Sequence, residues 1–133
     1  MTTKETTGRE IALDVLTEVL ENGGFIHTSL SRALLKYQYL EKQERAFITR
    51  LTDGTVERLL TLDAAINACS KTRTEKMKPF IRTLLRMSAY QILYMDRIPD
   101  SAACNEAVKL AAKRHFSGLK GFVNGVLRSI SRR

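Results

Sequence analysis

The segment from Pro79 to Met95 constrains the fold more than any other part of the chain. Proline is tolerated at the first position of a helix, where its missing N–H group loses no partner. One apolar stripe of this segment has helical spacing, and further apolar residues lie beside it. The stripe consists of Ile81, Leu84, Leu85, Ile92 and Met95, with Phe80, Met87 and Tyr94 elsewhere on the helix. A helix that is apolar over most of its circumference must be covered by other elements, so we expect the central helix of a bundle.

The first third of the chain shows the same periodicity. Thr7 and Glu10 have the spacing of a capping box, which predicts a helix that starts near Gly8, and the stretch 22–24 (Asn-Gly-Gly) predicts its end. We expect a second helix to begin at a cap formed by Thr28 or Ser29.

Residues 43–60 and 62–69 continue the helical pattern, with a kink or a close helix contact expected at Gly54. Nowhere do apolar and polar residues alternate over a strand length between turn signals. The sequence therefore predicts an all-α bundle of about seven helices.

Length and composition are those of one globular domain, spanning residues 1–133. The chain is 44% apolar and 27% charged, and none of its apolar runs is long enough to cross a bilayer. The polar start MTTKETTGRE lacks a secretory apolar stretch, and the two cysteines suit reduced thiols, so we expect a cytoplasmic protein without membrane contact.

Positive charge is concentrated in the second half of the chain. Residues 1–70 carry 8 Lys/Arg and 10 Asp/Glu, whereas residues 71–133 carry 14 and 4, so the net charges are −2 and +10. This distribution favours an anionic partner, of which nucleic acid is the commonest for a cytosolic protein. The alternative is an ordinary solvated surface.

The end of the chain has two different faces when it is placed on a helix. An apolar stripe runs from Leu119 to Ile130, and a polar ridge lies opposite. The ridge consists of Lys120, Asn124, Arg128 and Arg132, spaced four residues apart. Gly121 and Gly125 each cost about 1 kcal/mol of helix propensity. We expect them to be compensated in a tight helical hairpin with Ala103, Ala107 and Ala111.

Three ordered motifs resemble the NusB-like helical domain: LLRMSAYQILYMDRIP, NEAVKLA and LKGFVNGVLR. The likeness extends from Arg9 to Arg128. The family has two main branches, the free-standing antitermination factor and the N-terminal domain of bacterial ribosomal RNA cytosine-C5 methyltransferases of the RsmB (Sun/Fmu) type. The resemblance implies an RNA-binding domain with a NusB-like fold.

Three features favour the methyltransferase branch. The antitermination factor typically opens with an arginine-rich segment that contacts RNA, whereas this chain has only Lys4 and Arg9 there. The motif LKGFVNGVLR looks like the methyltransferase version, and the chain stops at Arg133, where that branch would continue into its catalytic domain. This resemblance implies a domain that presents small-subunit ribosomal RNA to a separate catalytic domain using S-adenosylmethionine.

The candidate RNA-binding residues follow from the distribution of charge. We expect phosphates to be bound by Lys109, Lys113, Arg114, Lys120, Arg128 and Arg132. Asn105 and Asn124 are further candidates, although a mid-helix asparagine more often bonds a neighbouring group. Arg82 and Arg86 share one face of the central helix and would reach solvent, a partner or a buried carboxylate.

The chain alone shows no catalytic site. Methylation at cytosine C5 needs a thiolate nucleophile and a cofactor site built on a glycine-rich strand-to-helix turn. Cys69 and Cys104 match neither catalytic motif of the methyltransferases, and His27 and His115 are too few for a metal cluster. Two alternatives remain open: the antitermination factor, binding leader RNA and a ribosomal protein, or an interaction module that docks onto its own catalytic domain. The sequence does not define the oligomeric state.

Overall fold

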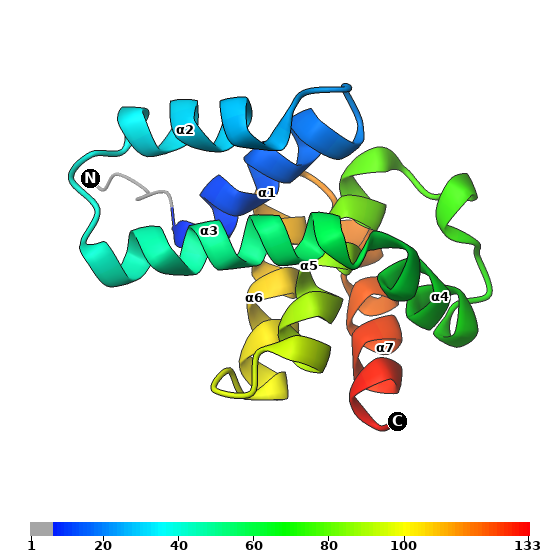
Figure 1. Ribbon diagram of the computed structural model, residues 1–133. Coiled ribbons are helices and arrows are strands. Elements are labelled where there is room, and N and C mark those ends of the chain that lie inside the picture. The colour runs from blue at the N-terminus through cyan, green and yellow to red at the C-terminus, as the bar shows by residue number, and fades with distance from the viewer. Residues whose placement is uncertain (1–6) are drawn as a thin grey trace.

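The computed structural model describes residues 7–133, which form seven α-helices and two single-turn 3₁₀ helices and contain no strand (Figure 1). The α-helices are α1 (Gly8–Leu20), α2 (Ile26–Lys36), α3 (Lys42–Glu57), α4 (Leu59–Cys69), α5 (Pro79–Tyr94), α6 (Asp100–Lys113) and α7 (Lys120–Ser131). The 3₁₀ helices are η1 (Thr74–Lys76) and η2 (Ser117–Leu119). The predicted fold class is confirmed.

Helix α5 is the central helix, as its apolar circumference predicts. It begins at Pro79 and packs against α1, α3, α4, α6 and α7. Leu84, Leu85 and Met87 project from different sides of α5, and all three are fully buried. Helices α1, α2 and α3 pack on one another on one side of α5, while α4, α6 and α7 flank its other side (Figure 1).

The first helix begins and ends where the sequence predicts. The side chain of Thr7 accepts a hydrogen bond from the backbone N–H of Glu10 at 3.1 Å, which satisfies a donor in the first turn. After the helix, Gly23 adopts a φ of 79°, a left-handed conformation that glycine reaches without steric cost. The second helix differs from the prediction, because it begins at Ile26 instead of at a Thr28 or Ser29 cap. Ser29 is buried, so its side chain lies inside the fold and not at a helix end.

Gly54 is the close helix contact that the sequence allows. Helix α3 continues without interruption through this position. The ring of Tyr90 on α5 lies directly against Gly54, where a β-carbon would overlap it. The glycine therefore lets α3 and α5 approach closely.

The predicted hairpin of α6 and α7 is present, but the glycines of α7 take no part in its contact. Ala103, Ala107 and Ala111 are buried, as expected for a close approach of two helices. Gly121 and Gly125 are exposed, and a β-carbon at either position would have no described atom within 4 Å. The expected compensation by packing is wrong, because the apolar stripe of α7 faces the bundle and the glycines point away from it.

Candidate nucleic-acid interface

An open groove between α6 and α7 brings together five of the residues that the sequence singles out. Its volume is about 530 Å³. Helix α6 contributes Asn105, Val108 and Lys109, and helix α7 contributes Lys120, Gly121, Asn124 and Arg128. The polar side chains share the groove because Asn105 and Lys109 on one helix, and Lys120, Asn124 and Arg128 on the other, are spaced four residues apart and the two helices pack side by side. We call this the α6–α7 groove.

The cations of the α6–α7 groove are largely free of acidic partners. Among residues 7–133, no carboxylate lies within 4 Å of the charged groups of Lys120 or Arg128. Arg128 donates a long hydrogen bond of 3.4 Å to Asn124, and Lys109 has a 3.4 Å contact with Glu106 while its side chain remains 73% exposed. Exposed pairs of this kind contribute little to stability, so Lys109 is available to another anion.

The outer face of α7 leaves its backbone uncovered. Gly121 and Gly125 lie one turn apart on this face, and Arg128 and Arg132 continue it. Arg132 is exposed at the end of the helix and does not line the groove. Two glycines weaken the helix without serving any contact within the described fold, and they allow a partner to approach the backbone closely. The sequence analysis missed this because it assigned the glycines to packing.

Two predicted phosphate ligands are instead engaged by the acidic first helix. Lys113 contacts Glu10 at 2.6 Å, and Arg114 contacts Glu10 at 3.0 Å and Asp14 at 2.7 Å. Burial alone would raise the pKa of the Glu10 carboxyl, but the hydrogen bonds from both cations lower it below its ordinary value. Lys113 and Arg114 therefore tie the end of α6 to α1, and their charges are already offset.

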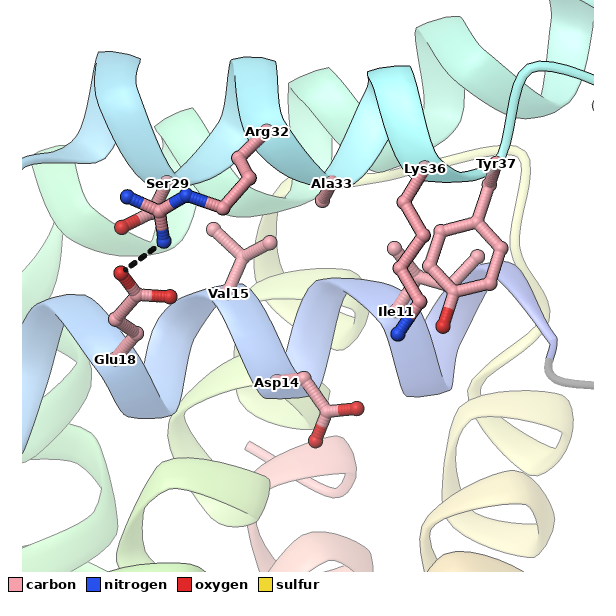
Figure 2. Close-up of a pocket in the computed structure, with 9 residues that line it drawn as sticks. All are labelled: Ile11, Asp14, Val15, Glu18, Ser29, Arg32, Ala33, Lys36 and Tyr37. Atoms are coloured by element: carbon pink, nitrogen blue, oxygen red, sulfur yellow. Dashed lines mark hydrogen bonds and ion pairs between the residues drawn. The ribbon is translucent and has the colours of Figure 1, made fainter.

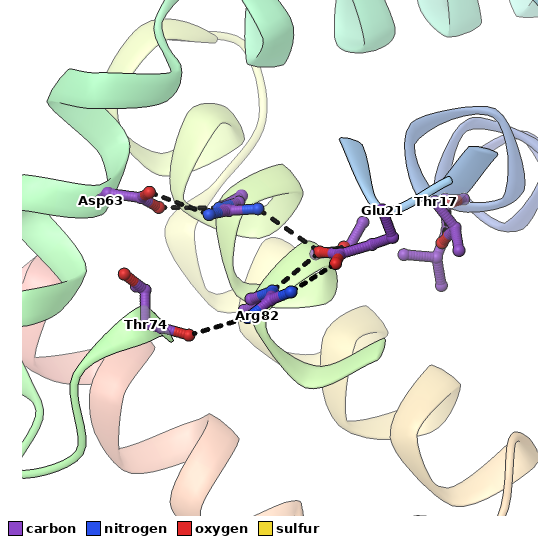
Figure 3. A network of polar contacts seen from close by, with 8 residues as sticks. Thr17, Glu21, Asp63, Thr74 and Arg82 are labelled. Atoms are coloured by element: carbon purple, nitrogen blue, oxygen red, sulfur yellow. Dashed lines mark hydrogen bonds and ion pairs between the residues drawn. The ribbon is translucent and has the colours of Figure 1, made fainter. Parts of the chain in front are cut away.

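Arg82 and Arg86 meet carboxylates, one of the three alternatives that the sequence left open. Arg82 donates to Glu21 at 2.8 Å, and Thr83 donates to the same carboxylate at 3.0 Å. Arg86 forms two hydrogen bonds with Asp63, at 2.7 and 2.9 Å, and also lies 3.5 Å from Glu21 (Figure 3). The hydrogen bond from Arg82 lowers the pKa of Glu21. This network joins the end of α1 to α4 and α5, and we call it the Glu21 clamp.

A pocket between α1 and α2 has a different character (Figure 2). Its volume is about 160 Å³, its floor is apolar, and its rim carries charges of both signs. Arg32 donates to Glu18 at 2.8 Å, and Lys36 lies over the ring of Tyr37 at 5.3 Å from the centroid. Mixed charge in a small pocket does not suit a polyanion, so this pocket is a poorer nucleic-acid site than the α6–α7 groove.

Neither a membrane span nor a metal centre is found among residues 7–133. None of the helices there is long and apolar enough to cross a membrane. Over the same part of the chain, no three His, Cys, Asp or Glu side chains come together in a way that would hold a metal ion.

Sequence relatives span most of this chain. A probable ribosomal RNA small subunit methyltransferase B of Bacillus subtilis is 39% identical over 129 residues, which cover 97% of this chain but only 28% of that protein. The transcription antitermination protein NusB of Symbiobacterium thermophilum is 32% identical and is matched over 86% of its length. The chain thus spans less than a third of the methyltransferase relative and most of the antitermination relative.

Solved structures show the same fold. A crystal structure of the antitermination factors NusB and NusE in complex with dsRNA superposes with a TM-score of 0.85 at 19% identity, over 94% of this chain and 93% of that one. The model of the NusB family matches residues 6–132, which is nearly the whole sequence. On this match and these relatives, the chain belongs to the NusB family.

Proposed function

We propose that this domain binds ribosomal RNA and positions it for a cytosine-C5 methyltransferase domain elsewhere in the same longer, cytoplasmic protein. S-adenosylmethionine, the methyl donor, would be held by that other domain. The proposal is supported by the greater identity to the methyltransferase relative, 39% against 32% for the antitermination protein.

The observation that carries the RNA-binding part is the α6–α7 groove. Lys109, Lys120 and Arg128 place three cations around one open depression, and Asn105 and Asn124 add hydrogen-bonding groups. Lysine and arginine bind phosphates and release condensed counterions, which gives affinity without sequence selectivity. Such a surface suits a domain that holds RNA while another domain selects the base.

Salt dependence of binding tests this proposal. A labelled single-stranded RNA is titrated with the domain between about 50 and about 300 mM KCl, and affinity is read from fluorescence anisotropy. Each lost phosphate contact to a single strand reduces the magnitude of the negative slope of log affinity against log salt by about 0.7. We therefore expect Lys120→Ala combined with Arg128→Ala to reduce the magnitude of the slope by about 1.4.

A charge-matched control separates this effect from a change in net charge. Lys36 and Lys71 are both exposed, and neither lines the α6–α7 groove. Replacing both by alanine removes the same two charges and should leave the slope nearly unchanged. If the groove variant and the control behave alike, Lys120 and Arg128 do not contact RNA and the proposal fails.

The antitermination factor is the second candidate, favoured by the match over 86% of the Symbiobacterium protein. It predicts tight association with a small-subunit ribosomal protein, which a pull-down with purified protein measures. Strong retention of that protein, with the same salt slope for parent and groove variant, would favour this candidate.

A further inference from the structure

A second basic groove lies at the start of α1, where α3 and the α5–α6 connection meet it. Its volume is about 610 Å³. The residues that matter here are Arg9, Phe47, Arg50, Met95, Arg97 and Ile98. They come from three segments that are far apart in the sequence, so no local pattern indicates this site. We call it the Arg50–Arg97 groove.

Two of its three guanidinium groups are available to a ligand. Arg97 is exposed and has no carboxylate within 4 Å among residues 7–133, and Arg50 is exposed and donates to the backbone carbonyl of Tyr94 at 3.1 Å. Arg9 is held in place, because it donates to Gln91 at 2.8 Å and lies over the ring of Phe47 at 5.4 Å. Arg50 and Arg97 are therefore the groups that would bind phosphate.

The carboxylate that lines this groove belongs to Glu44, and among residues 7–133 it has no ion pair within 4 Å with Arg50 or Arg97. Glu44 lies on the first turn of α3, and its Oε2 atom stands beside Gly8 in the first turn of α1. A carboxylate at a helix N-terminus is stabilised by the helix dipole, which gives Glu44 a structural role there. Arg50 and Arg97 keep their positive potential.

Apolar side chains complete the groove and indicate which form of RNA it suits. Phe47, Met95 and Ile98 line it beside the arginines. Single-stranded RNA places its bases against apolar and aromatic surfaces while cations follow its phosphates. Met95 is largely buried, so a base would meet mainly the partly exposed Ile98 and the edge of the Phe47 ring that Arg9 leaves open. A duplex keeps its bases stacked inside and presents phosphates and 2′-hydroxyls, so it would leave these two side chains unused.

Helix α6 adjoins both basic grooves, and one carboxylate on it lies near a cation of each. Glu106 contacts Lys109 of the α6–α7 groove at 3.4 Å. Its charge also acts on Arg9 of the other groove, where it opposes the lowering of the Arg9 pKa by burial. The segment that leads into α6 lines the Arg50–Arg97 groove with Met95, Arg97 and Ile98, and α6 itself lines the other groove with Asn105 and Lys109, so a strand running along the first half of α6 can reach both.

We infer that a single-stranded RNA held in the α6–α7 groove continues across α6 into the Arg50–Arg97 groove, where Arg50 and Arg97 bind its phosphates. The inference rests on the proposed function and adds the path and the strandedness of the RNA.

The test compares two lengths of oligouridine, of about 5 and about 16 nucleotides, which bracket common single-strand sites. A slope of 0.7 per phosphate corresponds to about 5-fold in affinity per contact at 0.1 M salt, or about 25-fold for two contacts. We expect Arg50→Ala combined with Arg97→Ala to weaken binding of the long oligonucleotide by about 25-fold and binding of the short one by less than about 2-fold. Arg50→Lys combined with Arg97→Lys keeps both positive charges, so it should retain most of the affinity for the long oligonucleotide.

The outcomes separate this inference from the function on which it rests. Suppose the Arg50/Arg97 variant matches the Lys36/Lys71 control at both lengths, while the Lys120/Arg128 variant weakens both. The second groove is then off the RNA path, and only this inference is overturned. Equal weakening of short and long RNA, or tighter binding of polyglutamate than of oligouridine, also overturns it. A parent domain that binds neither oligonucleotide at low salt overturns the proposed function as well.

Discussion

Replacing Glu21 by glutamine removes the charge on which the Glu21 clamp depends. The side chain of Glu21 is 7% exposed and accepts hydrogen bonds from Arg82 and Thr83 at 2.8 and 3.0 Å. Removing one partner of a buried ion pair costs about 3–5 kcal/mol, because the other charge stays behind in a desolvated place. Arg82 is 23% exposed and can reach water, and Arg86 keeps its two bonds to Asp63. We therefore expect Glu21→Gln to lower the free energy of unfolding by about 3 kcal/mol, the lower end of this range.

Urea denaturation followed by far-ultraviolet circular dichroism measures this loss at pH 7. A loss of about 3 kcal/mol corresponds to a fall of about 10 °C in Tm for a domain of this size. Glu57→Gln is the matched control, because Glu57 is exposed at the end of α3 and surface changes stay within about 0.5 kcal/mol. If Glu21→Gln costs less than about 1 kcal/mol, the clamp is no stronger than a surface ion pair and our account of it is wrong.

Three further predictions concern stability. Gly54→Ala should lower the free energy of unfolding by more than about 2 kcal/mol, because its methyl group would overlap the Tyr90 ring. Gly125→Ala places its methyl group in open space on a helix and should raise the free energy of unfolding by about 0.5–1 kcal/mol. Equal shifts of the urea midpoint for the two variants would contradict the environments assigned to the two glycines. His115 has a φ of 73°, which costs a residue with a β-carbon about 1 kcal/mol, so His115→Gly should raise Tm by a few degrees, and an unchanged or lower Tm would argue against strain there. The lowered pKa of Glu10 means that its two ion pairs stabilise the fold above the ordinary pKa of 4.5 and lose this effect as the pH falls through the lowered value; the parent should therefore lose stability below about pH 4.5 more steeply than Glu10→Gln, as acid titration of the unfolding free energy would reveal.

The helical framework was predictable because it depends on local signals. The apolar circumference of residues 79–95 requires burial whatever the neighbours are, and five other helices pack against the helix there. Likewise, the Thr7 cap and the left-handed Gly23 depend on residues within one turn. The packing of α6 against α7 was predictable for a related reason, because two consecutive helices with a short connection form a hairpin.

The partners of individual residues were not predictable in this way. Lys113 and Glu10 are 103 positions apart, so the cation looks free until the tertiary fold places the carboxylate 2.6 Å from it. The surroundings of a glycine are equally hard to predict from the sequence. Gly54 lies against the Tyr90 ring and Gly125 meets open space, yet both occur within a regular helical pattern. The Arg50–Arg97 groove joins three separate segments, which no local pattern reports.

The central claim is that RNA binds the surface formed by α6 and α7, and amide chemical shifts test it most directly. Oligouridine is titrated into the ¹⁵N-labelled domain, and the glycine amides, which lie in an uncrowded spectral region, serve as reporters. Gly121 and Gly125 should shift progressively until saturation, while Gly23 and Gly24, in the turn between α1 and α2, should stay in place. If oligouridine binds and saturates other amides while Gly121 and Gly125 do not move, the interface lies elsewhere and the claim is contradicted.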